Sequence, residues 1–233
     1  VPFIFGLLIA PAGIYIRRHL DEAPEFKESS EKTDAPLRDT FAHQKMRLLI
    51  GAGSVIMATV SVYLSLYIPT YAVKQLGLPA WSSFAAMSVA GLIMFIGSPL
   101  VGAMSDKIGR TPFMITSSAL YIVLTYPMFV FLTNSPGFLQ LLLLQTVIGV
   151  LMTMYFASMP ALLADIFPVA TRGTGMSLAY NIAVTIFGGF AGLIITWLID
   201  FTGNKLSVSY FVIFGAVLSL IATLAARFVL RLR

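Results

Sequence analysis

Residues 84–104 read FAAMSVAGLIMFIGSPLVGAM, a run without a single Asp, Glu, Lys, Arg or His. A helix rises about 1.5 Å per residue, so roughly 20 residues cross the ~30 Å hydrocarbon core of a bilayer. Lipid offers the backbone no hydrogen-bond partner, so such a run must satisfy its N–H and C=O groups within its own helix. Five more runs of this length have no ionisable residue in their interior, at residues 48–72, 112–132, 138–160, 175–199 and 208–228. The sequence therefore predicts an all-α polytopic membrane protein with six full transmembrane helices.

Composition and charge agree with this fold class. The chain is 58% hydrophobic and 11% charged, with a mean hydropathy of +0.89. All of its Lys and Arg residues except Lys74 and Lys205 fall on one side of the predicted spans. By the positive-inside rule that side is cytoplasmic, so the basic excess indicates topology and not a nucleic-acid partner. We expect a multi-pass protein of the plasma membrane (a bacterial inner membrane), with the region before the first full span and the C-terminus in the cytoplasm.

The residue inventory argues against enzymatic chemistry. There is no cysteine for a disulfide or a thiol nucleophile. His19 and His43 lie too far apart to predict a metal site, and no nucleophile-plus-base arrangement falls at membrane depth. We expect no cofactor, no metal and no catalytic residue.

The chain divides by composition. Its first apolar stretch is short and runs into Arg17-Arg18-His19, the reverse of the order in a signal peptide. It reads instead as the end of a span that begins before Val1. The predicted parts are the end of a transmembrane helix at 1–16, a charged cytoplasmic central linker at 17–47, a six-helix bundle at 48–228 and a cytoplasmic tail at 229–233.

One loop carries a family motif. Residues 102–111 read GAMSDKIGRT, which resembles the G-x-x-x-D-(R/K)-x-G-R-(R/K) loop of the major facilitator superfamily, found after the second span and repeated after the eighth. Gly102 can let helices approach closely and Gly109 permits a tight reversal. Asp106 can face a helix N-terminus, with Arg110 at the cytoplasmic surface.

A second motif gives the register. Residues 160–175 read PALLADIFPVATRGTG and resemble the acidic-x-(F/Y)-P-x-x-x-R-x-x-G segment that joins spans ten and eleven. The resemblance implies that the full spans are seven to twelve and that 1–16 ends span six. Residues 13–26 and 177–190 are similar to the metabolite:proton symporters, which carry citrate and other organic acids, 2-oxoglutarate, shikimate, or proline and betaine. Gly192 stands where that pattern has a proline, so no proline kink is predicted in span eleven.

The charged residues of both motifs are expected at the same face. We hypothesise that Asp106, Arg110, Asp165 and Arg172 form a cluster that latches the cytoplasmic side, with Gly102 and Gly109 shaping the turn beside it. Partly buried charge networks contribute more than exposed pairs, which suits a switch between two states of similar energy. The alternative is that these charges only mark the membrane boundary.

Two polar stripes recur every four residues, and a third, shorter stripe has spacings of four and three, so each follows one face of a helix. They are Thr59, Tyr63, Tyr67 and Tyr71; Gln145, Gly149 and Thr153; and Asn181, Thr185 and Gly188. Such side chains can line a cavity for a small polar solute, or they can simply pack helices together. Tyr71 is expected in the outer aromatic belt. The candidate substrate-binding residues are Tyr63, Tyr67, Gln145, Thr153 and Asn181.

No charge is predicted near the bilayer midplane of these six spans. A charge there is costly and is retained for function. If the family resemblance holds, the proton-carrying carboxylate lies in a missing N-terminal six-helix half. The chain is then expected to be the C-terminal half of a secondary active transporter that moves an organic acid such as citrate with a proton, by alternating access. The alternatives are a proline/betaine-type zwitterion symporter and a membrane assembly subunit without transport of its own.

Overall fold

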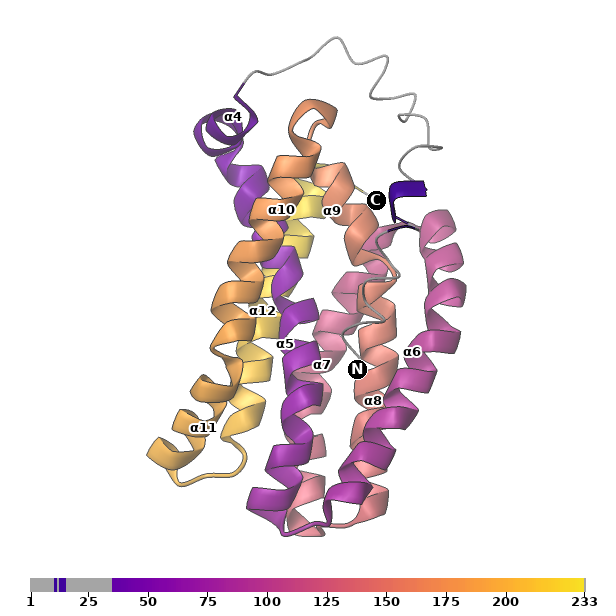
Figure 1. Cartoon of the computed structure of the whole chain (residues 1–233), viewed down its shortest axis with the longest axis vertical. Helices are drawn as coiled ribbons and strands as arrows, with labels where there is room; N and C mark the ends of the chain where they lie inside the picture. Colours follow the sequence, from indigo (N-terminus) through magenta and orange to yellow (C-terminus); the bar gives the residue numbers. More distant parts are fainter. Residues whose placement is uncertain (1–10, 12, 16–34, 233) are drawn as a thin grey trace.

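The computed structural model describes residue 11, residues 13–15 and residues 35–232, which form helices and the turns between them (Figure 1). The predicted end of a preceding span and Arg17-Arg18-His19 lie mostly or wholly outside the described residues. Six helical stretches are long and apolar enough to cross a membrane: Lys45–Leu76, Ala80–Ile108, Arg110–Asn134, Phe138–Ile166, Val169–Thr202 and Ser207–Phe228. Each predicted apolar run falls within one of them, so the prediction of an all-α protein with six spans is confirmed.

The short helix α4 (Pro36–His43) precedes the bundle. Three long helices joined by very short turns form its first half: α5 (Lys45–Leu76), α6 (Ala80–Ile108) and α7 (Arg110–Asn134). Gly77 ends α5 with a φ of 69°, and Gly109 separates α6 from α7 with a φ of 111°. Side chains with a Cβ are strained in this region, so glycine permits both reversals. The prediction of a tight turn at Gly109 is confirmed.

The second half has two interrupted spans and one continuous helix. Its elements are α8 (Phe138–Phe156), α9 (Met159–Ile166), the 3₁₀ turn η1 (Val169–Thr171), α10 (Arg172–Ala183), the π-helical segment η2 (Val184–Gly189), α11 (Ala191–Thr202) and α12 (Ser207–Phe228). Pro160 has no N–H to donate into the preceding turn, and the helix is interrupted at Ala157 and Ser158 just before it. The break moves the end of this span to Ile166, beyond the expected run.

Consecutive spans run in opposite directions, and α5 is the most deeply buried span. α6 packs along α8, α12 lies against both α5 and α7, and α10 lies beside α5 (Figure 1). Small residues stand where helices cross. A Cβ added at Gly53 would lie 2.5 Å from the Cβ of Ala222, and one at Gly149 would lie 2.9 Å from the Cα of Ala90. Close approach of this kind holds membrane helices together by van der Waals contact.

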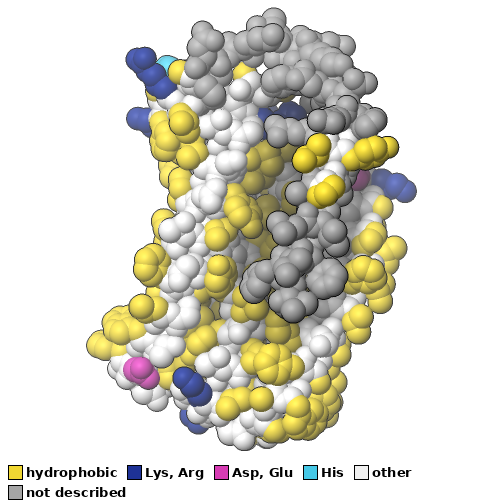
Figure 2. Space-filling view, in the orientation of Figure 1, with side chains coloured by type: hydrophobic (Ala, Val, Ile, Leu, Met, Phe, Trp, Pro, Cys, Tyr) yellow, Lys and Arg dark blue, Asp and Glu magenta, His cyan; other side chains and the backbone are white. Residues whose placement is uncertain are grey.

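Buried hydroxyl groups tie the helices to one another through backbone carbonyls. The Tyr155 hydroxyl donates to the carbonyl of Ser54 at 2.6 Å, and the Ser219 hydroxyl donates to that of Gly53 at 2.7 Å. Away from water such groups need a protein partner. On the face shown in Figure 2 the described Lys, Arg, Asp and Glu side chains stand near the two ends of the bundle, with apolar side chains between them. This layout is that of a chain crossing lipid.

Candidate functional site

A cavity of about 230 Å³ opens between α5, the α8–α9 break and α10. Its polar lining consists of Thr59 and Tyr63 from α5 and Tyr180 from α10. The remaining lining residues are Ala58, Val62, Leu66, Phe156, Met159 and Val184. This described lining holds hydroxyl groups, aromatic rings and a thioether but no charged side chain. It can therefore offer hydrogen bonds and an apolar surface to a solute.

A second cavity of about 290 Å³ continues from the first, since Met159 and Tyr180 line both. Asn181 lines this second cavity and keeps its side-chain nitrogen 2.7 Å from the carbonyl of Ser177. Its side-chain oxygen is left as an acceptor for a bound solute. The structure thus brings Tyr63 and Asn181, two of the predicted binding residues, to the same hollow face.

Tyr63 is held in place by a glycine on the facing helix. A Cβ at Gly188 would overlap the ring of Tyr63 and would lie 2.9 Å from Cγ2 of Thr59. The ring therefore lies directly against the backbone of η2. Gly188 was predicted as part of a polar stripe; its contact shows that it makes room for the aromatic ring.

Two other tyrosines of the α5 stripe have different surroundings. Tyr67 is partly buried, and its hydroxyl lies 3.2 Å from Oγ1 of Thr196 on α11. Tyr71 is fully buried, donates to the carbonyl of Lys205 at 3.0 Å and meets Phe129 edge to face at 5.6 Å. The expectation that Tyr71 belongs to an exposed aromatic belt is wrong, because α7 and the start of α12 cover it.

The α8 stripe faces α6. A Cβ at Gly149 would meet the backbone of Ala90, and Cγ2 of Thr153 lies 2.8 Å from where a Cβ at Gly97 would stand. Gln145 is fully buried, and neither side-chain nitrogen nor oxygen has a hydrogen-bond partner among the residues the structure describes. Gln145 and Thr153 line neither of the two cavities above. Their role in binding stays a prediction.

Tyr180 is the lining residue that sequence reasoning missed. It is 46% exposed and borders both cavities. The predicted polar stripe of span eleven begins at its neighbour Asn181, and Tyr180 lies on a different face of the helix, so the pattern did not include it. Its position next to Asn181 in a polar part of span eleven was the available signal.

Span eleven is irregular although it has no proline between residues 175 and 199. Its middle is the π-helical segment η2, which ends at the Gly188-Gly189 pair and is followed by a break at Phe190. π turns are rare and gather at functional sites. Here the π-helical segment brings the backbone of Gly188 against the Tyr63 ring without any proline.

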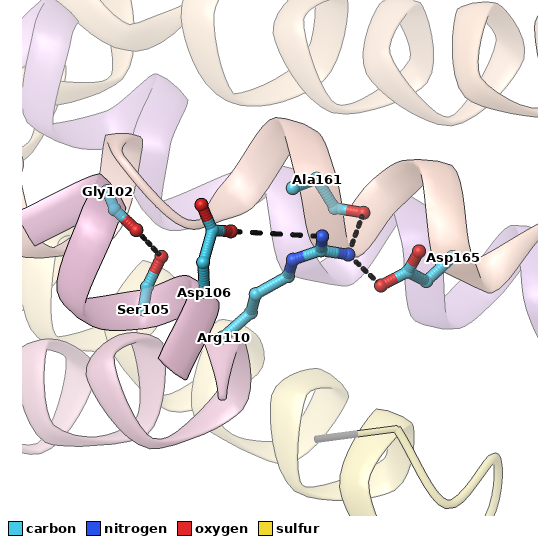
Figure 3. A network of polar contacts seen from close by, with 6 residues as sticks. All are labelled: Gly102, Ser105, Asp106, Arg110, Ala161 and Asp165. Atoms are coloured by element: carbon cyan, nitrogen blue, oxygen red, sulfur yellow. Dashed lines mark hydrogen bonds and ion pairs between the residues drawn. The ribbon is translucent and has the colours of Figure 1, made fainter. Parts of the chain in front are cut away.

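A charge cluster stands at one end of the bundle (Figure 3). Arg110, the first residue of α7, pairs with Asp165 on α9 and donates to the carbonyl of Ala161 at 3.2 Å. Asp106 on α6 lies 4.0 Å from the same guanidinium. The predicted residues Asp106, Arg110 and Asp165 therefore come together from three helices, and the Arg110–Asp165 pair joins α7 to the end of the broken span.

Gly102 and Arg172 lie near this cluster in the motif but contribute differently. Gly102 accepts a hydrogen bond from the Ser105 hydroxyl at 2.9 Å, and no described atom lies within 4 Å of where its Cβ would stand. It therefore does not mediate a close helix contact within the described chain. Arg172 is partly buried and is the first residue of α10. The two aspartates of the cluster, Asp106 and Asp165, pair with Arg110 and not with Arg172.

The same end is tied a second time, between α5 and the α9–α10 connection. Gln44 donates to the hydroxyl of Thr171 at 2.9 Å, and Arg47 donates to the carbonyl of Ile166. The buried ring of Phe167 fills the space left by Gly51 and Gly175. The sequence did not predict these contacts, because Gln44 and Thr171 are 127 residues apart in the chain.

Residues 85–233 match the family described as the Major Facilitator Superfamily. The chain is 34% identical over 227 residues to a citrate-proton symporter of Klebsiella pneumoniae, and 33% identical over 227 residues to a citrate-proton symporter of Salmonella typhi. These alignments cover 96% of this chain and 51% and 52% of the two relatives. An ectoine/proline transporter of Corynebacterium glutamicum is 28% identical over 238 residues, covering 96% of this chain and 47% of that protein. The chain thus spans about half the length of the curated relatives it matches, and no solved structure matches it significantly.

Proposed function

This chain belongs to the major facilitator superfamily, and we propose that it forms the C-terminal half of a symporter that moves a small organic acid, citrate first among the candidates, together with a proton. The observation that carries the proposal is the 34% identity to a citrate-proton symporter across 96% of the chain. The other half of the carrier would be supplied by a six-helix N-terminal part of the same polypeptide, since the chain corresponds to about half of that relative.

The cavity beside α5 suits one wall of a binding site for such a solute. The hydroxyls of Tyr63 and Tyr180 can donate hydrogen bonds to carboxylate or hydroxyl oxygens, and the side-chain oxygen of Asn181 can accept one from a solute hydroxyl. Tyr67, one turn further along α5, extends the same wall. Because this lining is neutral, the cation that balances an organic anion and the carboxylate that takes up the proton are assigned to the opposite half. The proton and the anion then meet at the interface of the two halves.

Alternating access would require this bundle to rock against its partner around a central site. The Arg110–Asp165 pair and its neighbour Asp106 would stabilise one of the two end states at the surface. An end state needs only a few kcal/mol of preference to dominate the population. Asp165→Asn should therefore shift the protein toward the state open on this side. Accessibility of cysteines introduced on this side reports the shift, and unchanged labelling would contradict the latch.

A zwitterion such as proline or ectoine is the second candidate. It is favoured by the relation to an ectoine/proline transporter at 28% identity and by the neutral lining of the cavity. A zwitterion needs a cationic and an anionic partner, so it would depend even more on the opposite half than an anion does.

Transport by the full-length protein in proteoliposomes tests the proposal. With an inward proton gradient, labelled citrate should accumulate and should be lost when the gradient is collapsed, whereas proline and betaine should not accumulate. Accumulation of proline alone would replace the first candidate by the second. Failure to move any solute of either class would support a non-transporting subunit.

Point variants then test the site within the same assay. Tyr63→Phe and Tyr180→Phe should each raise the apparent KM for the transported solute, because each removes one hydroxyl from the cavity. Tyr210→Phe is the matched control, since Tyr210 lies on α12, stacks against Tyr126 and lines neither cavity. Equal behaviour of all three variants would remove the cavity from the binding site.

A further inference from the structure

A separate cavity of about 410 Å³ lies at the end of the bundle where α6 ends, α7 begins and α12 ends. It shares no lining residue with the two cavities beside α5. Its walls are Ile108, Thr111, Pro112, Arg227, Phe228, Arg231 and Leu232.

The charge of this cavity is one-sided. Arg227 in the last turn of α12 and Arg231 just beyond it both line it, and none of its described walls is acidic. The nearest acid in sequence, Asp106, is 4.0 Å from Arg110 in the charge cluster. The start of α7 and the ends of α6 and α12 all meet at the cavity, so the positive dipole end of one helix is opposed by the negative ends of two others. The two arginines are therefore what attracts an anion here.

Thr111 provides an observation independent of charge. Its side chain is fully buried, and its Oγ1 has no hydrogen-bond partner among the described residues. A buried hydroxyl without a partner is uncommon in folded proteins and calls for an explanation, such as a bound group. The oxygen is enclosed by protein, so an oxygen-rich anion in the cavity that Thr111 lines would accept its hydrogen bond only after the side chains covering it move aside.

Arg231 belongs to a folded structure and not to a loose tail. It adopts a left-handed backbone conformation with a φ of 55°. Around it, the N–H of Leu230 bonds to the carbonyl of Ala225 at 3.3 Å and that of Leu232 bonds to Ala226 at 3.1 Å. Leu230 and Leu232 pack against the core. The chain therefore turns back after α12 and holds the Arg231 side chain at the cavity.

We propose that this cavity binds the phosphate of an anionic phospholipid. The rim of the cavity favours a lipid as the source of the phosphate, because Ile108 is 60% exposed and Phe228 is 71% exposed at the ends of two membrane-crossing helices. Acyl chains would cover these side chains while Arg227 and Arg231 hold the headgroup. Basic pockets between membrane helices are known places for acidic headgroups. Inorganic phosphate shares the headgroup chemistry and is distinguished by experiment.

Native mass spectrometry of the full-length protein tests the site. The protein is released from mixed micelles that contain equal amounts of phosphatidylglycerol and phosphatidylcholine, and the bound lipids are counted. Wild type should retain phosphatidylglycerol preferentially. Arg227→Gln combined with Arg231→Gln should reduce this preference by about tenfold. Thr111→Val, which changes no charge and conserves the shape of the side chain, should reduce it by a smaller factor.

The control is Lys74→Gln combined with Lys205→Gln, which removes two charges at the opposite end and should leave the preference unchanged. If the arginine and threonine variants retain as much phosphatidylglycerol as wild type does, the site is refuted. If wild type shows no lipid preference but inorganic phosphate raises the Tm in an Arg227- and Arg231-dependent manner, the anion site stands and the lipid source is wrong. The site would also be refuted if only the Lys74→Gln and Lys205→Gln control changed the preference for phosphatidylglycerol.

Discussion

The polar stripes of α5 and α8 have the same four-residue period but different surroundings. On α5, Thr59 and Tyr63 line an open cavity and lie against Gly188 of η2. On α8, Gly149 and Thr153 are buried against α6 and line neither cavity beside α5. A helical period identifies which residues share a face, but the neighbouring helix decides what that face does.

The difference comes from where glycine stands in each contact. On α8 the glycine belongs to the stripe itself, so the backbone of α6 comes within contact distance and no space remains. On α5 the glycine is on the opposite element, and the large side chain of Tyr63 belongs to the stripe. That ring reaches across to η2 and holds the helices apart beside it. The first arrangement closes the interface, and the second leaves a cavity.

The largest effect is expected from Gly149→Leu on α8. A Cβ at this position would lie 2.9 Å from the Cα and 3.1 Å from the carbonyl oxygen of Ala90, both of which are backbone atoms that cannot rotate away. Overpacking of this kind should cost roughly 3 kcal/mol of unfolding free energy. The measurement is the Tm of the purified full-length protein. Gly91→Leu on α6 is the control, since no described atom lies within 4 Å of its Cβ position, and an equal Tm loss there would contradict the contact.

Gly188→Ala should come next and should act on transport more than on stability. Its methyl group would displace the Tyr63 ring and so narrow or reshape the cavity. Uptake should fall by about tenfold or more, since misplacement of a binding group by about 1 Å is already costly. Gly189→Ala, at the next position, has open space around its Cβ and should transport normally. Equal uptake by the two variants would show that the Tyr63 position is unimportant.

Gln145→Leu tests the opposite expectation for α8. A buried amide without partners costs about 1–3 kcal/mol, so replacing it by an apolar side chain should leave the Tm unchanged or raise it slightly. The apparent KM should also stay at the wild-type value. A raised KM with an unchanged Tm would instead establish Gln145 as a substrate contact, as its place in the sequence pattern predicts.

The smallest effect is expected from Tyr67→Phe. The hydroxyl of Tyr67 is 3.2 Å from that of Thr196 at a position that the described chain leaves partly open, so its hydrogen bond should contribute only about 0.5–1 kcal/mol. We expect a Tm within a few degrees of wild type and a KM shift smaller than that of Tyr63→Phe. A larger shift for Tyr67→Phe would move the centre of the site along α5 toward α11.

The sequence predicted the six spans because that result depends only on length and on the absence of charge. It also predicted that Asp106, Arg110, Asp165 and Arg172 would form one cluster, because two short motifs place them at span ends, and the first three of these do meet. It did not predict that the residues around the break before Pro160 would line a cavity. A proline indicates a kink, but it does not indicate which side chains lie beside that kink. The family resemblance is confirmed by the matches to known transporters.

The remaining errors come from long-range contacts. Tyr71 looked exposed because it lies near the end of a span, yet the carbonyl of Lys205 and the ring of Phe129 enclose it. The sequence has no proline that would indicate the irregular segment η2. In both cases the deciding partner is far away in the sequence, and no local pattern carries that information. Tyr180 was missed for a simpler reason, because a period-four search keeps one face of a helix and discards the next.

The contact between Tyr63 and Gly188 makes these two positions share a single volume. A side chain can grow at position 188 only if the one at position 63 shrinks, so the two should co-vary in size among related carriers while the cavity between them moves from one helix toward the other. Carriers that exchange the pair would present their aromatic ring from span eleven instead of span seven. A change of solute could then be achieved by two coordinated substitutions without any change in the helices that carry them.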